Sequence, residues 1–381
     1  MDVAFFLRGM DQLGVDFYTG VPDSLLRPLN DTLLSRYGLT GAHVVAANEG
    51  GAVGLAAGHY IATGKPALVY LQNSGIGNAV NPIASLLHER VYGIPCVFVV
   101  GWRGEPGVKD EPQHAFQGMV TREMLTLLDL TVFELSADTS ADDYLAMLAR
   151  SRPLLDEGRS LAFLVHQGGL TGGEHPTVEN DAPLSREAAL RELLNGVGPT
   201  DCLISTTGKT SRELFALRET MGQGHDRDFL TVGSMGHAGM IALGMAKSQL
   251  ERRFWCLDGD GAALMHLGSL AVEVQQRRVN LIHVLLNNGA HESVGGMPVA
   301  GGKFHFAQVA CAIGFESVFT AHSAEELRLL LPRIRQSAGE QLCFLEIMLH
   351  PGSRDDLGRP TRTPRQNMLG LMQKLKEDAQ L

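Results

Sequence analysis

Apolar, β-branched runs alternate with helix-sized segments along almost the whole chain, and this alternation constrains the fold more than any other feature. In a parallel sheet, the connecting helices cover both faces of the strands. Such strands therefore appear in the sequence as continuous apolar runs. The pattern therefore predicts an α/β protein built from doubly wound parallel sheets. The expected strands are Val15–Thr19, Ala42–Ala46, Ala67–Leu71, Pro95–Val100, Thr131–Leu135, Leu161–His166, Cys202–Ser205, Phe229–Val232, Phe254–Leu257, Leu281–Leu286 and Cys343–Met348. The expected helices include Pro22–Tyr37, Gly50–Ala62, Ala141–Arg150, Arg186–Leu194, Gly236–Gln249 and Ala324–Gln336.

One segment interrupts this alternation near the middle of the chain. Residues 167–184 are rich in Gly, Pro and polar side chains, which favour loops over packed elements. We expect them to link two domains of similar size, residues 1–166 and 185–350. The tail, residues 351–381, is rich in Arg and Pro near its start and is interpreted as an extended arm that ends in a short helix. It either stays in solvent or packs on a neighbouring subunit.

Charge and cysteine content exclude several classes of protein. The formal net charge is −10 and no basic stripe is present, so nucleic-acid binding is not expected. No apolar stretch approaches the roughly 18 residues of a membrane span, and the N-terminus lacks the apolar core of a signal peptide. The five cysteines are widely spaced, and four lie in or beside apolar runs, which indicates reduced core thiols in a cytoplasmic protein.

The strongest chemical signal lies at the ends of two expected strands in the second half. Gly259-Asp260-Gly261 ends one strand, and Asn287-Asn288 ends another after 25 intervening residues. Carboxylate and amide oxygens are hard ligands that suit Mg²⁺ or Ca²⁺, and glycine lets the backbone approach a phosphate. The pattern favours a divalent ion that holds a diphosphate, with a plain surface turn as the alternative for Gly-Asp-Gly taken alone.

Three other phosphate or metal motifs do not fit the same region. An EF-hand loop starting at Asp258 would end on Ser269 instead of Glu. A Walker A loop ending at Gly208-Lys209 would need glycine where Leu203 stands, and no G-x-G-x-x-G follows the first strands.

The Gly-Asp-Gly and Asn-Asn pair at this spacing resembles the cofactor signature of the thiamine diphosphate-dependent decarboxylases. The resemblance implies a pyrimidine-binding half followed by a diphosphate-binding half, without the middle domain of the large pyruvate decarboxylases. It implies that Asp260, the side chain of Asn288 and the carbonyl of Ala290 bind Mg²⁺. It also implies that Gly261 and Ala262 donate N–H groups to the diphosphate.

Other segments resemble further parts of the same site. Glu49, after an expected strand, matches the glutamate that hydrogen-bonds N1′ of the aminopyrimidine and activates the cofactor. Met235 matches the apolar wedge beneath the cofactor, and the carbonyl of Gly233 would accept from the 4′-amino group. The remaining cofactor contacts implied by the resemblance are Asn73, Thr207, Gly208 and Lys209.

Three segments are similar to the phosphonopyruvate decarboxylase branch of the family: 20–24, 101–114 and 287–296. The sulfopyruvate decarboxylases are near relatives of that branch. Phosphonopyruvate carries two acidic groups, and Arg103, Lys109 and His114 lie within twelve residues, so we expect them to bind the substrate. A charged surface loop is the alternative, because acidic residues interleave with these cations.

The chain departs from the pyruvate decarboxylases in two places. Their adjacent His-His pair is absent, and Val294 stands where they carry an acidic residue after the metal-binding Asn. The residue that supplies the final proton is therefore open among Asp23, His114, His291 and Glu292.

The resemblance as a whole implies decarboxylation of 3-phosphonopyruvate to phosphonoacetaldehyde and CO2, in the biosynthesis of phosphonates, antibiotics among them. It implies a homo-oligomer in which the first domain of one subunit and the second domain of its neighbour share the cofactor. Sulfopyruvate decarboxylation and an acetolactate-type carboligation are alternatives on the same fold. A catalytically silent partner subunit is a third, although Glu49 and the expected metal ligands are all retained.

Overall fold

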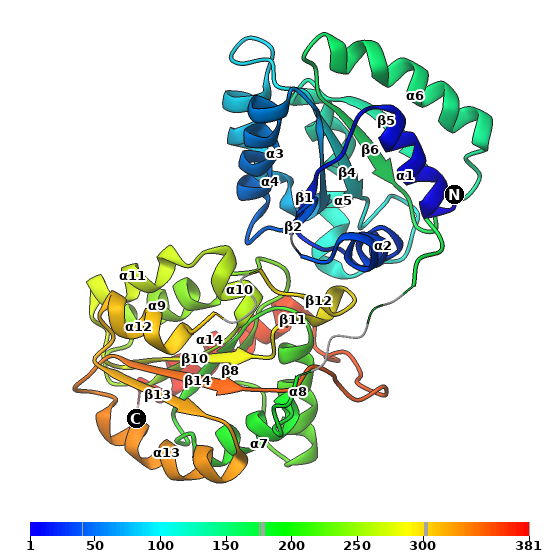
Figure 1. Cartoon of the computed structure of the whole chain (residues 1–381). Coiled ribbons are helices and arrows are strands. Elements are labelled where there is room, and N and C mark those ends of the chain that lie inside the picture. Colours follow the sequence, from blue (N-terminus) through cyan, green and yellow to red (C-terminus); the bar gives the residue numbers. More distant parts are fainter. Residues whose placement is uncertain (40, 175, 177–179, 301–303, 381) are drawn as a thin grey trace. The chain divides into compact units, whose positions relative to one another are not determined.

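Each half of the chain folds around its own six-stranded parallel sheet in this computed structural model (Figure 1). The structure describes all residues except 40, 175, 177–179, 301–303 and 381. Unit 1 comprises Met1–Thr177 and Ser293–Ala300, and unit 2 comprises Val178–Glu292 and Gly301–Leu381. The predicted α/β fold with doubly wound parallel sheets is confirmed.

Unit 1 has the strand order β2-β1-β3-β4-β6-β5. Strands β3 and β4 pair from Ala67 with Cys96 to Gln72 with Gly101. Its strands are β1 (Tyr18–Gly20), β2 (His43–Val45), β3 (Ala67–Gln72), β4 (Cys96–Gly101), β5 (Thr131–Leu135) and β6 (Leu161–Val165). Its helices are α1 (Val3–Gln12), α2 (Arg27–Tyr37), α3 (Glu49–Thr63), α4 (Ile76–Pro82), α5 (Pro112–Leu127) and α6 (Ala141–Asp156), with a 3-10 turn at Asn73–Gly75, a π-helical turn at Ile83–Leu87 and the short strand β12 (Met297–Pro298).

Both faces of this sheet are buried under helices. Leu68 and Tyr70 of β3 pack in a core with α1, α2 and α6. Val69 and Leu71 of the same strand point the other way, into a core with α3, α4 and α5. Successive side chains of a strand alternate between faces, so a strand covered on both sides must be apolar throughout.

Unit 2 has the strand order β13-β14-β10-β9-β7-β8. If the six strands of this sheet are numbered in chain order and the sheet is followed from its opposite edge, the order is 2-1-3-4-6-5. This is also the order in unit 1. Its strands are β7 (Cys202–Ser205), β8 (Asp228–Leu230), β9 (Phe254–Gly259), β10 (Leu281–Asn287), β11 (Ala290–His291), β13 (Ser317–Ala321) and β14 (Cys343–Met348). Its helices are α7 (Arg186–Gly196), α8 (Lys209–Thr220), α9 (Ala238–Ser248), α10 (Asp260–Met265), α11 (Gly268–Gln276), α12 (Phe306–Ile313), α13 (Ala324–Ser337) and α14 (Pro364–Asp378), and a 3-10 turn covers Glu292–Val294.

The second sheet is also covered on both faces. Helices α7, α8 and α13 bury one face. Helices α9 and α14, with α11 and α12, bury the other. Four of the five cysteines are buried and all five are free, as expected for core thiols.

The boundaries of two helices differ from the prediction: one helix begins later than expected and the other ends later. The helix expected from Pro22 begins at Arg27, because residues before it form a turn in which the Asp23 side chain accepts from the Leu25 N–H at 3.0 Å. The helix expected to end at Arg150 continues to Asp156 and includes Pro153.

The tail ends in a helix, as expected, and this helix packs on its own unit instead of staying in solvent. Helix α14 has 15 residues and packs on β8 of its own unit. Asn367 accepts from the Leu230 N–H at 3.0 Å and donates to the Asp228 carbonyl at 2.9 Å, and Leu371 is buried. At the other end of the helix, Asp378 accepts from Arg252 at 2.7 Å, and Leu375 packs on the same core.

The ends of the expected linker are attached to the two units. Thr171 pairs with the N-terminus, donating to the Met1 carbonyl at 2.8 Å, and Leu184 lies in a core of unit 2. Residues 175 and 177–179 of this segment lie outside the described residues.

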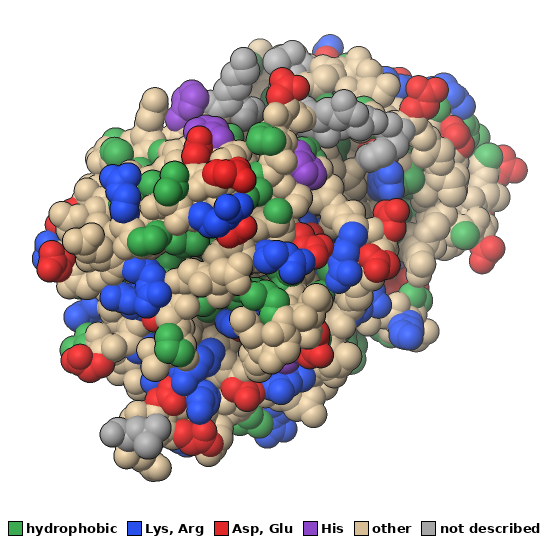
Figure 2. Space-filling view, turned by 90° about the horizontal axis from the view of Figure 1, so that it is seen from below, with side chains coloured by type: hydrophobic (Ala, Val, Ile, Leu, Met, Phe, Trp, Pro, Cys, Tyr) green, Lys and Arg blue, Asp and Glu red, His purple; other side chains and the backbone are tan. Residues whose placement is uncertain are grey.

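Within the described residues, every helix falls short of the length and apolar character that a membrane span requires. On the face seen in Figure 2, basic and acidic side chains are interspersed.

Candidate active site

The expected site residues gather at the carboxyl ends of the strands in both units. In unit 1, Asp23, Glu49, Asn73 and Arg103 follow β1, β2, β3 and β4. Because these four strands are adjacent in the sheet, their carboxyl ends share one edge, where open α/β sheets bind ligands. The same holds in unit 2, where the residues that follow β7, β8, β9 and β10 are Thr207, Gly233, Asp260 and Asn288.

Glu49 is a buried carboxylate at the first residue of α3. It is 4% exposed, and its Oε2 accepts from Nδ2 of Asn78 at 2.7 Å. A Cβ at position 75 would stand 2.1 Å from Oε1 of Glu49, so any other residue there would displace this carboxylate. Burial raises the pKa of Glu49, and the hydrogen bond from Asn78 offsets only part of that rise. The carboxyl group is therefore set up to exchange a proton.

Asp23 and His114 are buried in the same unit, and burial shifts their pKa values in opposite directions. Asp23 accepts from Nε2 of Gln72 at 2.6 Å, and burial raises the pKa of its carboxyl group. Burial, followed by the charge of Arg103, lowers the pKa of His114. Asp23 therefore keeps its proton to higher pH than an ordinary aspartate, and His114 loses its proton at lower pH than an ordinary histidine.

The side chain of Asn73 organises the loop after β4. Its Nδ2 donates to the Arg103 carbonyl at 2.7 Å and to Oγ1 of Thr121 at 2.8 Å. Arg103 in turn donates from Nε to Oδ2 of Asp110 at 2.8 Å, while Lys109 is exposed. Of the expected substrate cations, Arg103 is therefore held in an ion pair and Lys109 is on the surface.

In unit 2 the loop after β10 folds over Asp260. Oδ2 of Asp260 accepts from the Gly289 N–H at 2.6 Å, and Oδ1 of Asn288 accepts from the Ala290 N–H at 3.1 Å. The loop that carries Asn288 and Ala290 therefore lies against the Asp260 carboxylate. Burial raises the pKa of Asp260 to about 7. A buried carboxylate with only main-chain donors would be stabilised by a cation.

Two further loops meet at this edge of unit 2. The Gly233 N–H donates to Oγ1 of Thr207 at 3.0 Å, which ties the loops after β8 and β7 together. Ser234 has a φ of 48°, a left-handed conformation that costs energy for a residue with a Cβ and is found at functional sites. Met235 follows directly, and its methyl carbon lies 3.5 Å from where a Gly261 Cβ would stand.

His291 explains why position 261 is glycine. Its ring carbon Cε1 would lie 2.7 Å from a Cβ at Gly261. The ring is buried, and burial lowers its pKa to about 4. His291 is therefore neutral near pH 7 and packs against the backbone at the end of β9.

Lys209 and Glu292 are neighbours in unit 2. Lys209 Nζ donates to Oγ of Ser353 at 2.8 Å and lies 3.6 Å from Oε1 of Glu292. Glu292 also receives a hydrogen bond from Arg186, which pairs with Glu213 as well. The sequence analysis missed Arg186 and Glu213, and their separation from Glu292 along the chain leaves no local signal.

Comparisons with known proteins match both units to one family. The family models described as thiamine pyrophosphate enzyme, N-terminal and C-terminal TPP binding domain, match residues 3–125 and 207–347. The phosphonopyruvate decarboxylase of Streptomyces viridochromogenes is 36% identical over 380 residues, covering 95% of this chain and 91% of the relative. The chain belongs to the thiamine diphosphate-dependent decarboxylases.

Two other relatives of this decarboxylase show the range of similarity. The phosphonopyruvate decarboxylase of Streptomyces hygroscopicus is 37% identical over 380 residues, covering 94% of this chain and 90% of the relative. The sulfopyruvate decarboxylase of Methanosarcina acetivorans is 25% identical over 374 residues, covering 90% of each.

Thiamine diphosphate, also called thiamine pyrophosphate, is accordingly the cofactor of this decarboxylase, and the residues of unit 2 fit it. The buried Asp260 carboxylate lies against the loop of Asn288 and Ala290, and a carboxylate, an amide oxygen and a main-chain carbonyl together suit a hard divalent ion.

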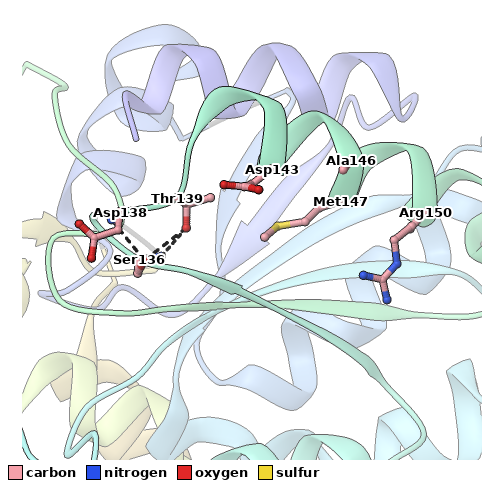
Figure 3. A pocket seen from close by; sticks show the side chains of 7 residues that line it. All are labelled: Ser136, Asp138, Thr139, Asp143, Ala146, Met147 and Arg150. Atoms are coloured by element: carbon pink, nitrogen blue, oxygen red, sulfur yellow. Dashed lines mark hydrogen bonds between the residues drawn. The ribbon is translucent and has the colours of Figure 1, made fainter.

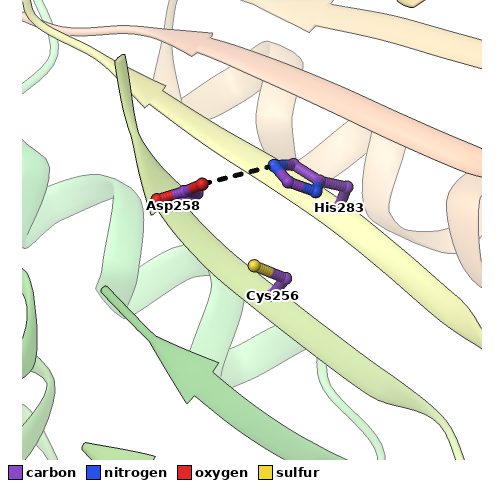
Figure 4. A group of neighbouring side chains, drawn as sticks. All are labelled: Cys256, Asp258 and His283. Carbon is purple, nitrogen blue, oxygen red and sulfur yellow. Dashed lines mark ion pairs between the residues drawn. The ribbon is translucent and has the colours of Figure 1, made fainter. Parts of the chain in front are cut away.

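A second polar group in this decarboxylase lies beneath that loop. Cys256, Asp258 and His283 are buried side by side on β9 and β10 (Figure 4). Burial raises the pKa of the Cys256 thiol well above its ordinary value, and His283 Nδ1 lies 3.1 Å from Oε2 of Glu273. Cys256, Asp258 and His283 lie on the two strands that lead to Asp260 and Asn288, and they are distinct from the expected metal ligands.

A pocket of about 410 Å³ lies elsewhere in unit 1, along α6 (Figure 3). None of the expected site residues lines it. Its lining residues are Ser136, Asp138, Thr139, Asp143, Ala146, Met147 and Arg150.

Proposed function

We propose that this chain decarboxylates 3-phosphonopyruvate to phosphonoacetaldehyde and CO2, with thiamine diphosphate and Mg²⁺. The main support for this substrate is the 36–37% identity to two phosphonopyruvate decarboxylases over 94–95% of the chain. Identity to a sulfopyruvate decarboxylase over a similar span is 25%, which makes sulfopyruvate the second candidate substrate.

In this proposal, unit 2 holds the ion and the diphosphate. Asp260, the Asn288 side chain and the Ala290 carbonyl bind Mg²⁺, and the N–H groups of Gly261 and Ala262 face the diphosphate. The hydrogen bond from the Gly289 N–H to Asp260 supports this, because it holds the loop of Asn288 and Ala290 against that carboxylate. The other proposed cofactor contacts of unit 2 are Thr207, Gly208, Lys209, Gly233 and Met235.

Unit 1 supplies the groups that move protons. When bound, thiamine diphosphate supplies a carbon nucleophile and accepts the electron pair left by CO2. Glu49 exchanges a proton with N1′ of the aminopyrimidine, which its burial and its neutral Asn78 partner favour. Asp23 gives a proton to the carbon that has lost CO2. Burial keeps Asp23 protonated to higher pH and His114 neutral, so Asp23 is the better donor.

The substrate anions face the loop after β4 in this proposal. Arg103 keeps further N–H donors beside its ion pair with Asp110, and Nη1 donates to Oγ of Ser24 at 2.8 Å. Guanidinium groups suit phosphonate oxygens because their donors form a planar fork. Lys109 and His114 complete the expected set.

We also propose a homo-oligomer in which unit 1 of one subunit and unit 2 of another share a cofactor. The family resemblance is the basis for this arrangement. The free cysteines support the expected cytoplasmic location. We assign the reaction to phosphonate biosynthesis, where the loss of CO2 would drive the preceding step toward its product.

The deciding experiment measures aldehyde release from phosphonopyruvate, sulfopyruvate and pyruvate in parallel, with and without thiamine diphosphate and Mg²⁺. We expect cofactor-dependent release that favours phosphonopyruvate by at least about tenfold in kcat/KM, or roughly 1.4 kcal/mol. A preference for sulfopyruvate would reassign the substrate and keep the site. Absence of release from all three, with cofactor bound, would refute the proposed reaction and favour carboligation or a silent partner.

A further inference from the structure

Glu292 occupies the point in unit 2 where an ion-pair network meets the proposed metal site. Its side chain is 9% exposed. Arg186, at the start of α7, donates to Oε2 of Glu292 through Nη1. Asn288 donates to the same oxygen through Nδ2, at 3.0 Å. Oε2 of Glu292 therefore accepts hydrogen bonds both from the buried guanidinium of Arg186 and from the amide of Asn288, a proposed metal ligand.

Arg186 cannot readily move away from this oxygen, because Glu213 holds it from the other side. Nε and Nη2 of Arg186 donate to the two carboxylate oxygens of Glu213 at 2.7 and 2.9 Å. The Arg186 and Glu213 side chains are 6% and 1% exposed. A two-bond contact between buried charges fixes both distance and angle, so Glu292 is attached to a rigid support.

The contacts of Asn288 determine which end of its amide faces the ion. An amide has a donor end and an acceptor end of nearly the same shape, and only the oxygen can bind a cation. Nδ2 of Asn288 faces Glu292, which as a carboxylate can only accept. Oδ1 faces the Ala290 N–H, which can only donate. Both contacts select the same orientation.

We propose that Glu292 is a positioning residue for the metal ion, holding the Asn288 carboxamide with its oxygen toward that ion. The inference rests on the proposed metal site. It removes Glu292 from among the proton donors, because its carboxylate already serves Arg186 and Asn288 and lies near Lys209. Groups that orient metal ligands in this way typically contribute 10–100-fold to metal affinity.

The test is a titration of the full-length protein with Mn²⁺ in the presence of thiamine diphosphate, with free Mn²⁺ measured by electron paramagnetic resonance. Glu292→Met removes both acceptor oxygens at similar volume, and we expect Mn²⁺ affinity to fall by about 10–100-fold. Glu292→Asp keeps the charge opposite Arg186 but is one methylene shorter. We expect it to lose affinity in the same direction while folding as the wild type does.

Glu292→Gln separates positioning from acid catalysis. Gln can place its carbonyl oxygen where Oε2 receives Arg186 and Asn288, but it cannot deliver a proton. We expect this variant to keep Mn²⁺ affinity within about threefold and to keep the wild-type pH profile of turnover. If Glu292 were a proton donor, both Glu292→Gln and Glu292→Met would lose turnover.

Two controls separate positioning from general support of the fold. Glu213→Gln loosens the support of Arg186 but keeps both acceptor oxygens of Glu292, so we expect a lower melting temperature and a much smaller loss of Mn²⁺ affinity than in Glu292→Met. In an Asn288→Asp background the ligand has two equivalent oxygens and no orientation to choose. There, Glu292→Met should no longer weaken Mn²⁺ binding.

Wild-type Mn²⁺ affinity in both Glu292→Met and Glu292→Asp would overturn the proposal. Equal losses from Glu292→Met in the wild-type and Asn288→Asp backgrounds would also overturn it, since they would show an effect that does not act through amide orientation. The Mn²⁺ readout needs no substrate. A wild-type protein that binds Mn²⁺ and thiamine diphosphate but releases no aldehyde refutes the proposed reaction and leaves this assignment standing.

Discussion

The two units share one strand order, but the acids proposed to move protons in unit 1 and the arginine-paired acids of unit 2 are buried beside different partners. In unit 1, Glu49 and Asp23 accept hydrogen bonds from neutral amides, those of Asn78 and Gln72. In unit 2, Glu213 and Glu292 accept from Arg186, and Asp228 accepts from Arg218 at 2.7 and 2.9 Å. A neutral partner lets a carboxyl group gain or lose a proton, whereas a guanidinium keeps it charged and in place. We infer that unit 1 is built for proton transfer and unit 2 for holding an ion.

Replacing Glu49 should have the largest effect on turnover. Glu49→Gln keeps the shape beside Gly75 and a contact for Asn78 but removes the titrating group. We expect kcat to fall by about 10²–10⁴-fold, the usual contribution of a positioned acid or base, with thiamine diphosphate affinity nearly unchanged. Steady-state kinetics and cofactor titration measure the two quantities separately. Wild-type turnover with saturating cofactor would show that Glu49 does not activate it.

Replacing Asp260 should affect unit 2 in the opposite manner. In Asp260→Ala the proposed ion loses its charged ligand, so Mg²⁺ and thiamine diphosphate should bind more weakly together, each by more than about 100-fold. Turnover should recover in part when both are raised to saturation. Calorimetric titration of cofactor at several Mg²⁺ concentrations measures this linkage. Unchanged cofactor affinity in the variant would contradict the role of Asp260 as a ligand.

Asp23 provides a pH test of unit 1. Burial raises the pKa of Asp23, so the protonated acid persists above the ordinary aspartate range and is lost as pH rises through the raised value. If Asp23 is the donor, wild-type kcat falls on the alkaline side as this group ionises. Asp23→Asn should lower kcat by about 100-fold and remove that alkaline limb. The matched variant His114→Gln should keep the limb, because burial already holds His114 neutral. If His114→Gln removed the alkaline limb and Asp23→Asn kept it, His114 would be the donor.

Sequence patterns could predict the edge where the site lies, because each motif follows a buried parallel strand and those strand ends share one edge. They could not predict the partners of the buried acids. Asn78 is 29 residues from Glu49, and Arg186 is 106 residues from Glu292. A contact over such a separation has no period and no fixed spacing, so a single sequence does not reveal it. The interpretation of Glu292 as a possible acid came from its position after Asn288, without knowledge of Arg186.

The smallest expected effect concerns an anchor of unit 2 that lies outside the proposed chemistry. Asn367 joins α14 to the edge strand β8 through two hydrogen bonds, at 3.0 and 2.9 Å, and is 4% exposed. Asn367→Ala leaves a buried N–H and a carbonyl without this partner, which should lower the free energy of unfolding by about 1–3 kcal/mol. Because the residue touches neither proposed ligands nor proton donors, kcat of the folded enzyme should stay close to that of the wild type.

Thermal or urea unfolding of Asn367→Ala, beside steady-state kinetics, checks both parts of this expectation. Gln373→Ala, on an exposed position of the same helix, is the matched control and should leave stability within about 0.5 kcal/mol. Equal stability of the two variants would mean that α14 does not dock on β8 in solution, and the tail would return to the alternatives of a solvated arm or a contact with a neighbouring subunit. A loss of kcat without a loss of stability would instead show that the edge of unit 2 next to Leu230 takes part in the chemistry. The contrast between a unit that moves protons and a unit that holds the ion would then no longer stand.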